Sequence, residues 1–512
     1  MQDAVQSVVD WADGVGFVIS PEKSKLLHVC FGHHHRPNLP YVSIGEHAVK
    51  AVREMKLLGV TIDNKLRFVK HAKLVKDNVN NKLNILRTLN GRFSEASRST
   101  LTKVARALVV PSILYGAELW SRGGVSLLKI LEPQYNEAYR ICSGALRSSP
   151  IASLLVENGK VPLVNVVTED LATKALRLLE RDPILNDRPT VARAREWWSD
   201  LTGVDFPTLA QRARLWQRAW DATAPKVDWR VKAMCGAGAS SSVAKAAFRE
   251  VTASYEGRLK LFTDGSLIEE EVGYGVSGED ISRCGRLPGL CGIFSAEAYA
   301  LLQACRLANG SQAVVFSVSA SCLSALEHGQ VGHPWLLEVQ RYANITFAWV
   351  PGHAGIPGNE AADKLANQGR LAQLEAIPVP YSDATRWVKQ TSRYAWNVSW
   401  HNNRDAFLRR IKNTTQEWKD APNSRDQKVL TRLRIGHTRL THGPRFSGSV
   451  AYCQGCGAVL DVNHLLVECP ARAQLREDMG VVGSIREVLF NDRSTEQTVL
   501  NFLRALDLYD MI

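Results

Sequence analysis

The stretch ITFAWVPGHAGIPGNEAADKLANQGR (345–370) reads as an apolar strand, a glycine-containing loop and a helix. Before it come three short stretches that are typical of strands joined by turns, LKLFTDGS, VGYGVSGED and ISRCGRLPG (259–289). Between them, SAEAYALLQACRLA and AVVFSVS (295–319) indicate a helix and a fourth strand. Three antiparallel strands followed by alternating helix and strand predict an α+β or α/β fold with a mixed five-stranded sheet and helices packed on it.

Acidic side chains stand where the predicted strands meet the helices. Asp264 comes at the end of the first strand, and Glu297 and Asp363 stand near the starts of two helices. His353 lies in the loop. Two Mg²⁺ ions about 4 Å apart, held by carboxylates, can activate water and stabilise the leaving oxygen in phosphodiester hydrolysis. Each residue alone also fits an ordinary turn, a helix-terminus acid or a surface loop, so only the combination predicts a nuclease site.

The motifs LFTDGS, SAEAYAL and WVPGHAGIPGNEAADKLA together resemble the type 1 ribonuclease H domain, over about residues 257–371. This resemblance implies divalent-metal-dependent cleavage of the RNA strand in RNA–DNA hybrids. It also implies that Asp264, Glu297 and Asp363 are Mg²⁺ ligands of a two-metal site. His353 would be the histidine of the flexible loop. The basic hybrid-binding helix of some family members is absent from this segment.

One acid of the family pattern is missing. The family places a further Asp at the end of the fourth strand, shortly before Ser-Ala-Leu. VVFSVSASCLSAL (314–326) has the same Ser-Ala-Leu, and this alignment puts Ser321 in the position of the acid. Glu327 lies about 9 Å further along the predicted helix, too far to replace it. Because a hydroxyl carries no negative charge for two dications, we expect turnover to fall by about 10²-fold or more.

The charge of the 512-residue chain is unevenly distributed. The total is +12, yet between Glu256 and Arg370 8 Lys and Arg stand against 12 Asp and Glu, a net −4 that leaves +16 for the remainder. This excess predicts an anionic partner, with nucleic acid favoured over a membrane surface. The sequence has no signal-peptide pattern and no apolar run that would span a bilayer, and its ten Cys are scattered. These features predict an intracellular protein of the cytoplasm or nucleus.

The tail carries CQGCGAVLDVNHLLVEC (453–469), with the spacing of a compact metal site. Its candidate ligands are Cys453, Cys456, His464 and Cys469. Three thiolates and one imidazole suit tetrahedral Zn²⁺, and four protein ligands favour a structural over a catalytic role. The alternative is a set of buried cysteines beside an incidental histidine.

The flanks of the ribonuclease H-like segment resemble non-LTR (LINE-type) retrotransposon polyproteins. RLRIGHTRLTHG (432–443) followed by the Cys cluster is similar to their C-terminal end, and Arg432 and Arg434 are candidate nucleic-acid contacts. VVDWADGVGFVISPEKSKLLHV (8–29) and LGVTIDNKLRFVKH (58–71) resemble the end of a reverse transcriptase palm leading into its thumb. The resemblance places Lys23 near the phosphates of an incoming nucleotide. The polymerase Asp-Asp motif would precede this chain, so we expect no polymerase activity from it alone.

These observations predict a ribonuclease H-like domain flanked by mainly helical regions. The predicted regions are a reverse transcriptase palm end and thumb-like remnant (1–125), a helical connector (126–255), the ribonuclease H-like domain (256–372), a basic helical region (373–450), a CCHC zinc knuckle (451–475) and a helical tail (476–512). The predicted function is a hybrid-cleaving ribonuclease, impaired at Ser321; the alternative is a catalytically dead nucleic-acid-binding remnant. A transposase or integrase of the same fold is disfavoured by the GHAGIPGNEAAD ending. We expect His33–His35 in a hairpin loop and the Arg/Trp-rich RARLWQRAW (212–220) on helices, with Trp in the core.

Overall fold

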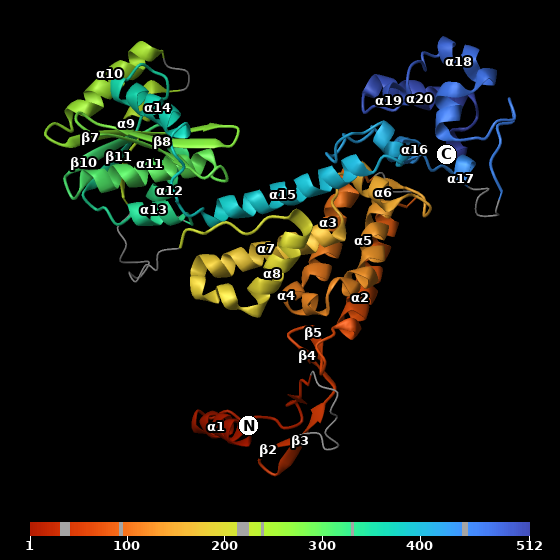
Figure 1. The fold of residues 1–512 in the computed structure, drawn as a ribbon, viewed down its shortest axis with the longest axis horizontal. Coiled ribbons are helices and arrows are strands. Elements are labelled where there is room, and N and C mark those ends of the chain that lie inside the picture. Colours follow the sequence, from red (N-terminus) through yellow and green to blue (C-terminus); the bar gives the residue numbers. More distant parts are fainter. Residues whose placement is uncertain (31–40, 92–95, 212–224, 237–239, 329–331, 443–448) are drawn as a thin grey trace. The chain divides into compact units, whose positions relative to one another are not determined.

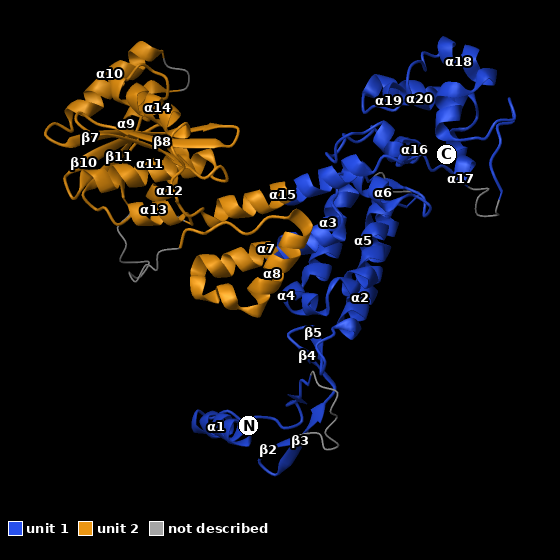
Figure 2. Cartoon of the chain, in the orientation of Figure 1, with its two compact units in different colours: residues 1–171, 392–512 blue, residues 172–391 orange. Residues whose placement is uncertain are grey.

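A computed structural model describes the chain except residues 31–40, 92–95, 212–224, 237–239, 329–331 and 443–448 (Figure 1). The chain divides into unit 1, residues 1–171 and 392–512, and unit 2, residues 172–391 (Figure 2). His33–His35 and RARLWQRAW lie outside the described residues. Helices α7 (Leu163–Arg181) and α15 (Tyr381–Asn402) each contribute residues to both units. Among the described helices, none combines the length and apolar character needed to cross a membrane.

Unit 2 is built around a six-stranded sheet with the strand order β6-β11-β10-β7-β8-β9. The strands are β6 (Lys226–Asp228), β7 (Leu259–Ile268), β8 (Glu271–Ser277), β9 (Ser282–Leu287), β10 (Ala313–Ser317) and β11 (Ile345–Trp349). β7, β8 and β9 form an antiparallel meander, whereas β10 is parallel to both β7 and β11. Ser317 pairs with Thr263 on one side and with Trp349 on the other. Asp264, the end of β10 and the loop after β11 therefore reach the same edge of the sheet.

Helices cover both faces of this sheet (Figure 1). α11 (Ile293–Ala308), α12 (Ala320–Glu327) and α13 (Pro334–Val339) lie on one side, and α10 (Ser241–Ala253) and α14 (Pro357–Arg370) on the other. Since neighbouring strand residues point to opposite faces, Tyr274 of β8 packs on Tyr299 of α11, while Gly275 faces α14. A Cβ at Gly275 would lie 2.3 Å from the carbonyl oxygen of Ala362. The glycine thus lets α14, which carries Asp363, lie directly on the strand.

The sheet has six strands in place of the predicted five, and the additional strand, β6, precedes residue 256. β6 comes from the predicted helical connector and pairs in parallel with β11. After it, α9 (Arg230–Cys235) and α10 bury apolar side chains such as Val231 and Val251 in one core with Phe316 and Val350 of the sheet region. A three-residue strand has no periodicity of its own, because the edge of β11 supplies its hydrogen bonds. β6, α9 and α10 therefore belong to the same fold as the predicted ribonuclease H-like domain.

The first part of unit 1 combines two small sheets with a helical bundle. One sheet has the order β1-β3-β2 (Leu26–Leu27, His47–Val52 and Tyr41–Ile44), and the other is the hairpin of β4 (Glu54–Leu57) and β5 (Val60–Asp63). The helices in this part are α1 (Gln2–Gly14), α2 (Val69–Leu89), α3 (Arg98–Leu114), α4 (Ala117–Trp120), α5 (Leu128–Ser143) and α6 (Ile151–Glu157). Val79, Leu83 and Leu86 of α2 are fully buried, in the helical spacing expected of an amphipathic helix.

The C-terminal segments of unit 1 share one apolar core. The helices here are α16 (Ser424–Ile435), α17 (Arg439–His442), α18 (Ala473–Asp478), α19 (Ile485–Val488) and α20 (Arg493–Ala505). Leu433 of α16, Leu465 beside the Cys cluster and Phe502 of α20 are fully buried in the same cluster. The basic helical region, knuckle and tail predicted as separate regions therefore form a joint core. The separation was suggested by composition, which does not report contacts across the chain.

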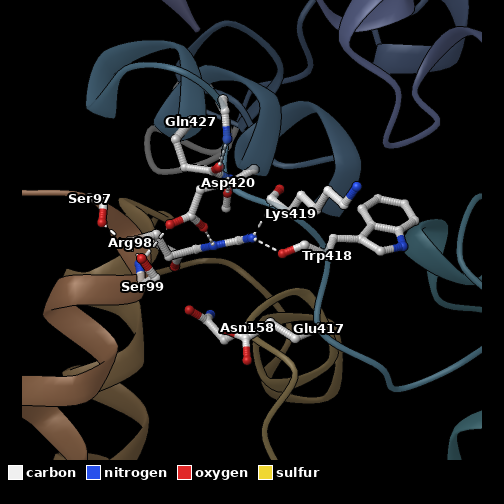
Figure 3. A network of polar contacts seen from close by, with 12 residues as sticks. Ser97, Arg98, Ser99, Asn158, Glu417, Trp418, Lys419, Asp420 and Gln427 are labelled. Carbon is white, nitrogen blue, oxygen red and sulfur yellow. Dashed lines mark hydrogen bonds and ion pairs between the residues drawn. The ribbon is translucent and has the colours of Figure 1, made fainter. Parts of the chain in front are cut away.

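A buried polar network joins the two parts of unit 1 (Figure 3). Arg98, at the start of α3, is 2% exposed. Its Nε donates to Asp420 Oδ1 at 2.8 Å, one terminal nitrogen donates to the Trp418 carbonyl at 2.7 Å, and the other lies 3.4 Å from Glu157 Oε1. A buried guanidinium requires such partners, because charge is costly to remove from water.

Candidate active site and cysteine cluster

Asp264 and Glu297 form the buried part of the acidic site. Asp264 lies on β7 and is 8% exposed, and Glu297 lies on α11 and is 6% exposed. The helix approaches the strand closely, because a Cβ at Gly265 would lie 3.0 Å from the Glu297 backbone nitrogen. Burial and the nearby Asp363 carboxylate raise the pKa of Asp264 to about 6, against the lowering effect of the Gly265 N–H. Burial and Asp264 raise the pKa of Glu297 well above its usual value.

Asp363 is held in place by a hydrogen-bonded chain from the sheet. Ser266 of β7 donates to Asn367 Oδ1 at 2.9 Å, and Asn367 Nδ2 donates to Asp363 Oδ1 at 3.0 Å. Asn367 lies one turn after Asp363 on α14, so the two side chains are neighbours on the helix surface. The hydrogen bond from the Asn367 amide therefore restricts rotation of the Asp363 carboxylate. The sequence analysis missed Ser266 and Asn367. The spacing of Asn367 from Asp363 was the available signal.

The loop after β11 places His353 beside two acids of α14. Ligand atoms of His353, Glu360 and Asp363 all lie within 4.8 Å of one another. His353 is exposed and has φ of +51°, in the left-handed region that is rare for residues with a side chain and is found at functional sites. Glu360, which the sequence analysis missed, accepts the Gly355 N–H at 3.0 Å and thereby fastens the loop to α14.

No acid stands at the junction of β10 and α12. β10 ends at Ser317, Ser319 is the residue before the first turn of α12, and Ser321 lies exposed inside the helix. The hydroxyls of Ser319 and Ser321 are 3.3 Å apart. The Ser-Ala-Leu alignment singled out Ser321, which lies in the first turn of α12. Two residues, Val318 and Ser319, stand at the junction itself, and Ser319 is the one with a polar side chain.

In the part of the chain that the structure describes, the ligand atoms of Asp363 lie within 4.8 Å of those of His353 and Glu360, and Asp264 and Glu297 do not belong to this group. The chemistry of Asp264 and Glu297 nevertheless suits a divalent cation. Among the described residues, Glu297 Oε2 is buried without a hydrogen-bond partner, although buried carboxylate oxygens normally have one. Burial and the negative charge of Asp264 raise the pKa of Glu297, and burial and the negative charge of Asp363 raise that of Asp264, so the carboxylates repel one another in this site. Carboxylate oxygens are the preferred ligands of Mg²⁺. A cation held by Asp264, Glu297 and Asp363 would relieve both the repulsion and the missing contact.

In unit 1 the structure brings the four tail residues together. Ligand atoms of Cys453, Cys456, His464 and Cys469 lie within 4.8 Å of one another. Cys469 Sγ is 3.7 Å from Cys453 Sγ and 3.9 Å from Cys456 Sγ. Tetrahedral zinc with bonds of about 2.3 Å would set its sulfurs about 3.8 Å apart. The Cys469 N–H donates to the His464 carbonyl in a π-helical turn, wider than the α-helical turn expected from the spacing.

The structure does not support the nucleic-acid contacts predicted for Arg432 and Arg434. Arg434 is 0% exposed and donates to Glu496 at 2.8 Å, and Arg432 donates to the carbonyls of Gly144 and Ile512. The run RLRIGHTRL therefore supplies structural cations, because its helix lies between acids and carbonyls distant in sequence. Lys23 is exposed in a turn after α1, where its predicted role stays a prediction.

Comparisons with known proteins place the similarity around the His353 loop and α14. Residues 333–371 match the RNase H family model. A ribonuclease H of Methylococcus capsulatus is 42% identical over 45 residues, 8% of this chain and 29% of that protein. A ribonuclease H of Saccharopolyspora erythraea is 61% identical over 33 residues, 6% of this chain and 21% of that protein. The crystal structure of RNase H1 from Halobacterium salinarum covers 22% of this chain and 97% of its own, at 22% identity and a TM-score of 0.18.

The matched segment carries His353, Glu360 and Asp363. The family-model match and the relatives support a ribonuclease H domain in this chain. The chain spans less than a third of the length of these curated relatives, so the similarity concerns this segment and not the activity of the whole protein.

Proposed function

We propose that unit 2 is a ribonuclease H-type hydrolase that binds RNA–DNA hybrids and cleaves their RNA strand weakly. The observation that carries this proposal is the group of Asp264, Glu297 and Asp363, in which two carboxyls are buried with raised pKa values. Paired acids of this kind at one sheet edge are common in functional sites and rarely serve stability. Weak activity is proposed because Ser319 and Ser321 carry no charge at the end of β10.

Each residue of the site has a role in this proposal. Mg²⁺ held by the three carboxylates would supply an activated water and a stabilised leaving oxygen. Asn367 orients Asp363 through its amide, and Glu360 positions the His353 loop by accepting the Gly355 N–H. The exposed imidazole of His353 would take up or release a proton near the departing product. The hydroxyl of Ser319 offers only a neutral dipole where negative charge is needed.

The second candidate is a nucleic-acid-binding remnant without catalysis, favoured by the missing acid at the β10–α12 junction. In both cases we propose that the chain is the C-terminal part of a non-LTR retrotransposon polyprotein acting in the cytoplasm or nucleus. The sulfur spacing of the tail cluster supports a structural zinc knuckle within unit 1.

A cleavage assay separates the two candidates. Full-length protein is incubated with a labelled RNA–DNA hybrid and Mg²⁺ or Mn²⁺, beside the variants Ser319→Asp, Ser321→Asp and Asp264→Asn. We expect slow cleavage by the parent, abolished in Asp264→Asn, and an increase of about 10²-fold in Ser319→Asp, since one essential electrostatic group is restored. We expect a smaller gain for Ser321→Asp, because its side chain projects from inside α12.

The outcomes bear on different parts of the proposal. Cleavage by neither the parent nor the Asp variants would refute the ribonuclease. Cleavage by the Asp variants alone would favour the remnant. Equal cleavage rates in the parent and in Ser319→Asp would refute the proposed impairment. A larger gain in Ser321→Asp than in Ser319→Asp would assign the position of the missing acid to Ser321, as the alignment predicted.

A further inference from the structure

The ribonuclease H-like segment itself is poorly equipped to hold a polyanion. It carries the net −4 between Glu256 and Arg370, and the basic helix found in some similar domains is absent from it. The segment just before it is different. Residues 226–255 carry five Lys and Arg against two acids, and the described part of this range joins the same fold through β6, α9 and α10. Positive charge for substrate binding is thus available on this extension.

α10 contacts the loop that carries His353. Ser241 Oγ, in its first turn, donates to the Ala354 carbonyl at 2.6 Å. One turn later, Lys245 lies over the same loop, because a Cβ at Gly355 would come within 2.7 Å of Lys245 Nζ. Ser241 therefore ties the residue after His353 to the extension, and Lys245 brings an ammonium group to the rim of the acidic site. Ser241 and Lys245 lie outside the segment that matches the RNase H model, whereas the loop residues that they contact lie inside it.

Lys245 is not used by the fold as an ion-pair partner. It is partly exposed, and within the described part of the chain no ion pair or hydrogen bond of its ammonium group is found. Its neighbour on the extension, Arg230, differs in being paired with Asp228 at 2.8 Å. Lys232 of α9 is also exposed, and its Nζ lies 4.9 Å from the ring of Trp229 and 5.9 Å from the ring of Trp349, the last residue of β11. Lys245 thus lies at the loop, and Lys232 lies near the end of the strand that leads into it.

We propose that the extension formed by β6, α9 and α10 is a substrate clamp, in which Lys245 and Lys232 bind phosphates of the RNA–DNA hybrid beside the acidic site. Ser241 is a positioning residue that fixes the loop against this clamp. An ammonium group suits this role because it acts as a point charge. By binding a phosphate it releases counterions condensed on the nucleic-acid backbone, and it does not discriminate between base sequences. This inference rests on the proposed function for its substrate, and it assigns hybrid binding to a segment outside the matched domain.

Salt-dependent binding tests the clamp without requiring cleavage. The affinity of full-length protein for a fluorescent RNA–DNA hybrid is measured by anisotropy at several NaCl concentrations. The variants are Lys245→Gln, Lys245→Arg and, as control, Arg341→Gln. Arg341 is exposed in unit 2 but precedes β11, at the sheet edge opposite to the His353 loop.

Loss of one phosphate contact should reduce the slope of log affinity against log salt by about 0.9. We expect this for Lys245→Gln, a retained slope in Lys245→Arg, and no change in Arg341→Gln. A Lys245→Gln slope equal to that of Arg341→Gln would overturn the clamp, and so would an equal loss in Lys245→Arg, which would indicate packing and not charge. Binding is measured directly and does not depend on cleavage. Absence of cleavage would therefore refute the ribonuclease activity but not the binding of the hybrid by Lys245.

Discussion

Substitution of Arg98 by Met should strongly destabilise unit 1. The change removes the guanidinium that contacts Glu157, Asp420 and the Trp418 carbonyl (Figure 3). Glu157 is 0% exposed, and among the described residues its carboxylate would keep Arg434 at 3.9 Å, the Thr431 hydroxyl at 3.4 Å and the nearby charge of Lys412. Breaking a buried ion pair by removing one partner costs about 3–5 kcal/mol. Asp420 adds little to this cost, because its side chain is 20% exposed and can regain water.

The assay is native-state hydrogen exchange measured by mass spectrometry. The peptides followed are those of α3 and α6, so the measurement reports on unit 1 and not on unit 2. A loss of about 3–5 kcal/mol corresponds to exchange faster by about 10²- to 10³-fold or more. The control is Arg425→Met, since Arg425 and Asp510 form a pair with both side chains 71% exposed and should contribute less than about tenfold. Arg98→Met/Glu157→Gln should recover part of the loss. Equal exchange in Arg98→Met and Arg425→Met would refute this reasoning.

Two further predictions concern the metal sites. Burial raises the folded-state pKa of Asp264 to about 6 and that of Glu297 well above normal, so unit 2 without metal should lose stability as pH rises from about 4 through about 6. Mg²⁺ should therefore raise its calorimetric melting temperature more at roughly pH 7.5 than at roughly pH 5, and equal shifts would contradict a cation at these acids. Cys469→Ser should abolish zinc measured by elemental mass spectrometry, whereas Cys284→Ser, in unit 2, should retain it; a metal-free parent would refute the knuckle.

Much of the sheet of unit 2 could be predicted from sequence, because its strands carry their own signals. β7 and β8 show runs of apolar residues and glycines bounded by turns, and Asp264 and Asp363 lie in motifs with distinctive neighbours. β6 could not be predicted, since three residues have no pattern and the strand depends on the edge of β11. Glu360 could have been found, because it precedes Asp363 by three residues on one helix face.

Arg434 shows why composition misleads about charged helices. The run RLRIGHTRL looks like a solvated cationic face, and burial of such a side chain depends on acids that the sequence places far away. Glu496 pairs with Arg434 from α20, and Glu157 approaches it from α6. Neither partner has any periodic relation to α16. The left-handed backbone of His353 could not be predicted from local sequence either, because it depends on how the loop connects β11 to α14.

The charge of the acidic site connects the missing acid to the number of metal ions. Asp264, Glu297 and Asp363 provide three negative charges, and without a cation the first two already resist joint ionisation. One divalent cation neutralises most of that charge, whereas two would leave an excess of positive charge that a carboxylate at Ser319 would offset. Under the proposed function, the site would therefore hold one cation tightly and a second one weakly. Slow cleavage with retained binding of metal and hybrid would follow from this balance, since binding needs charge on the rim and hydrolysis needs both ions.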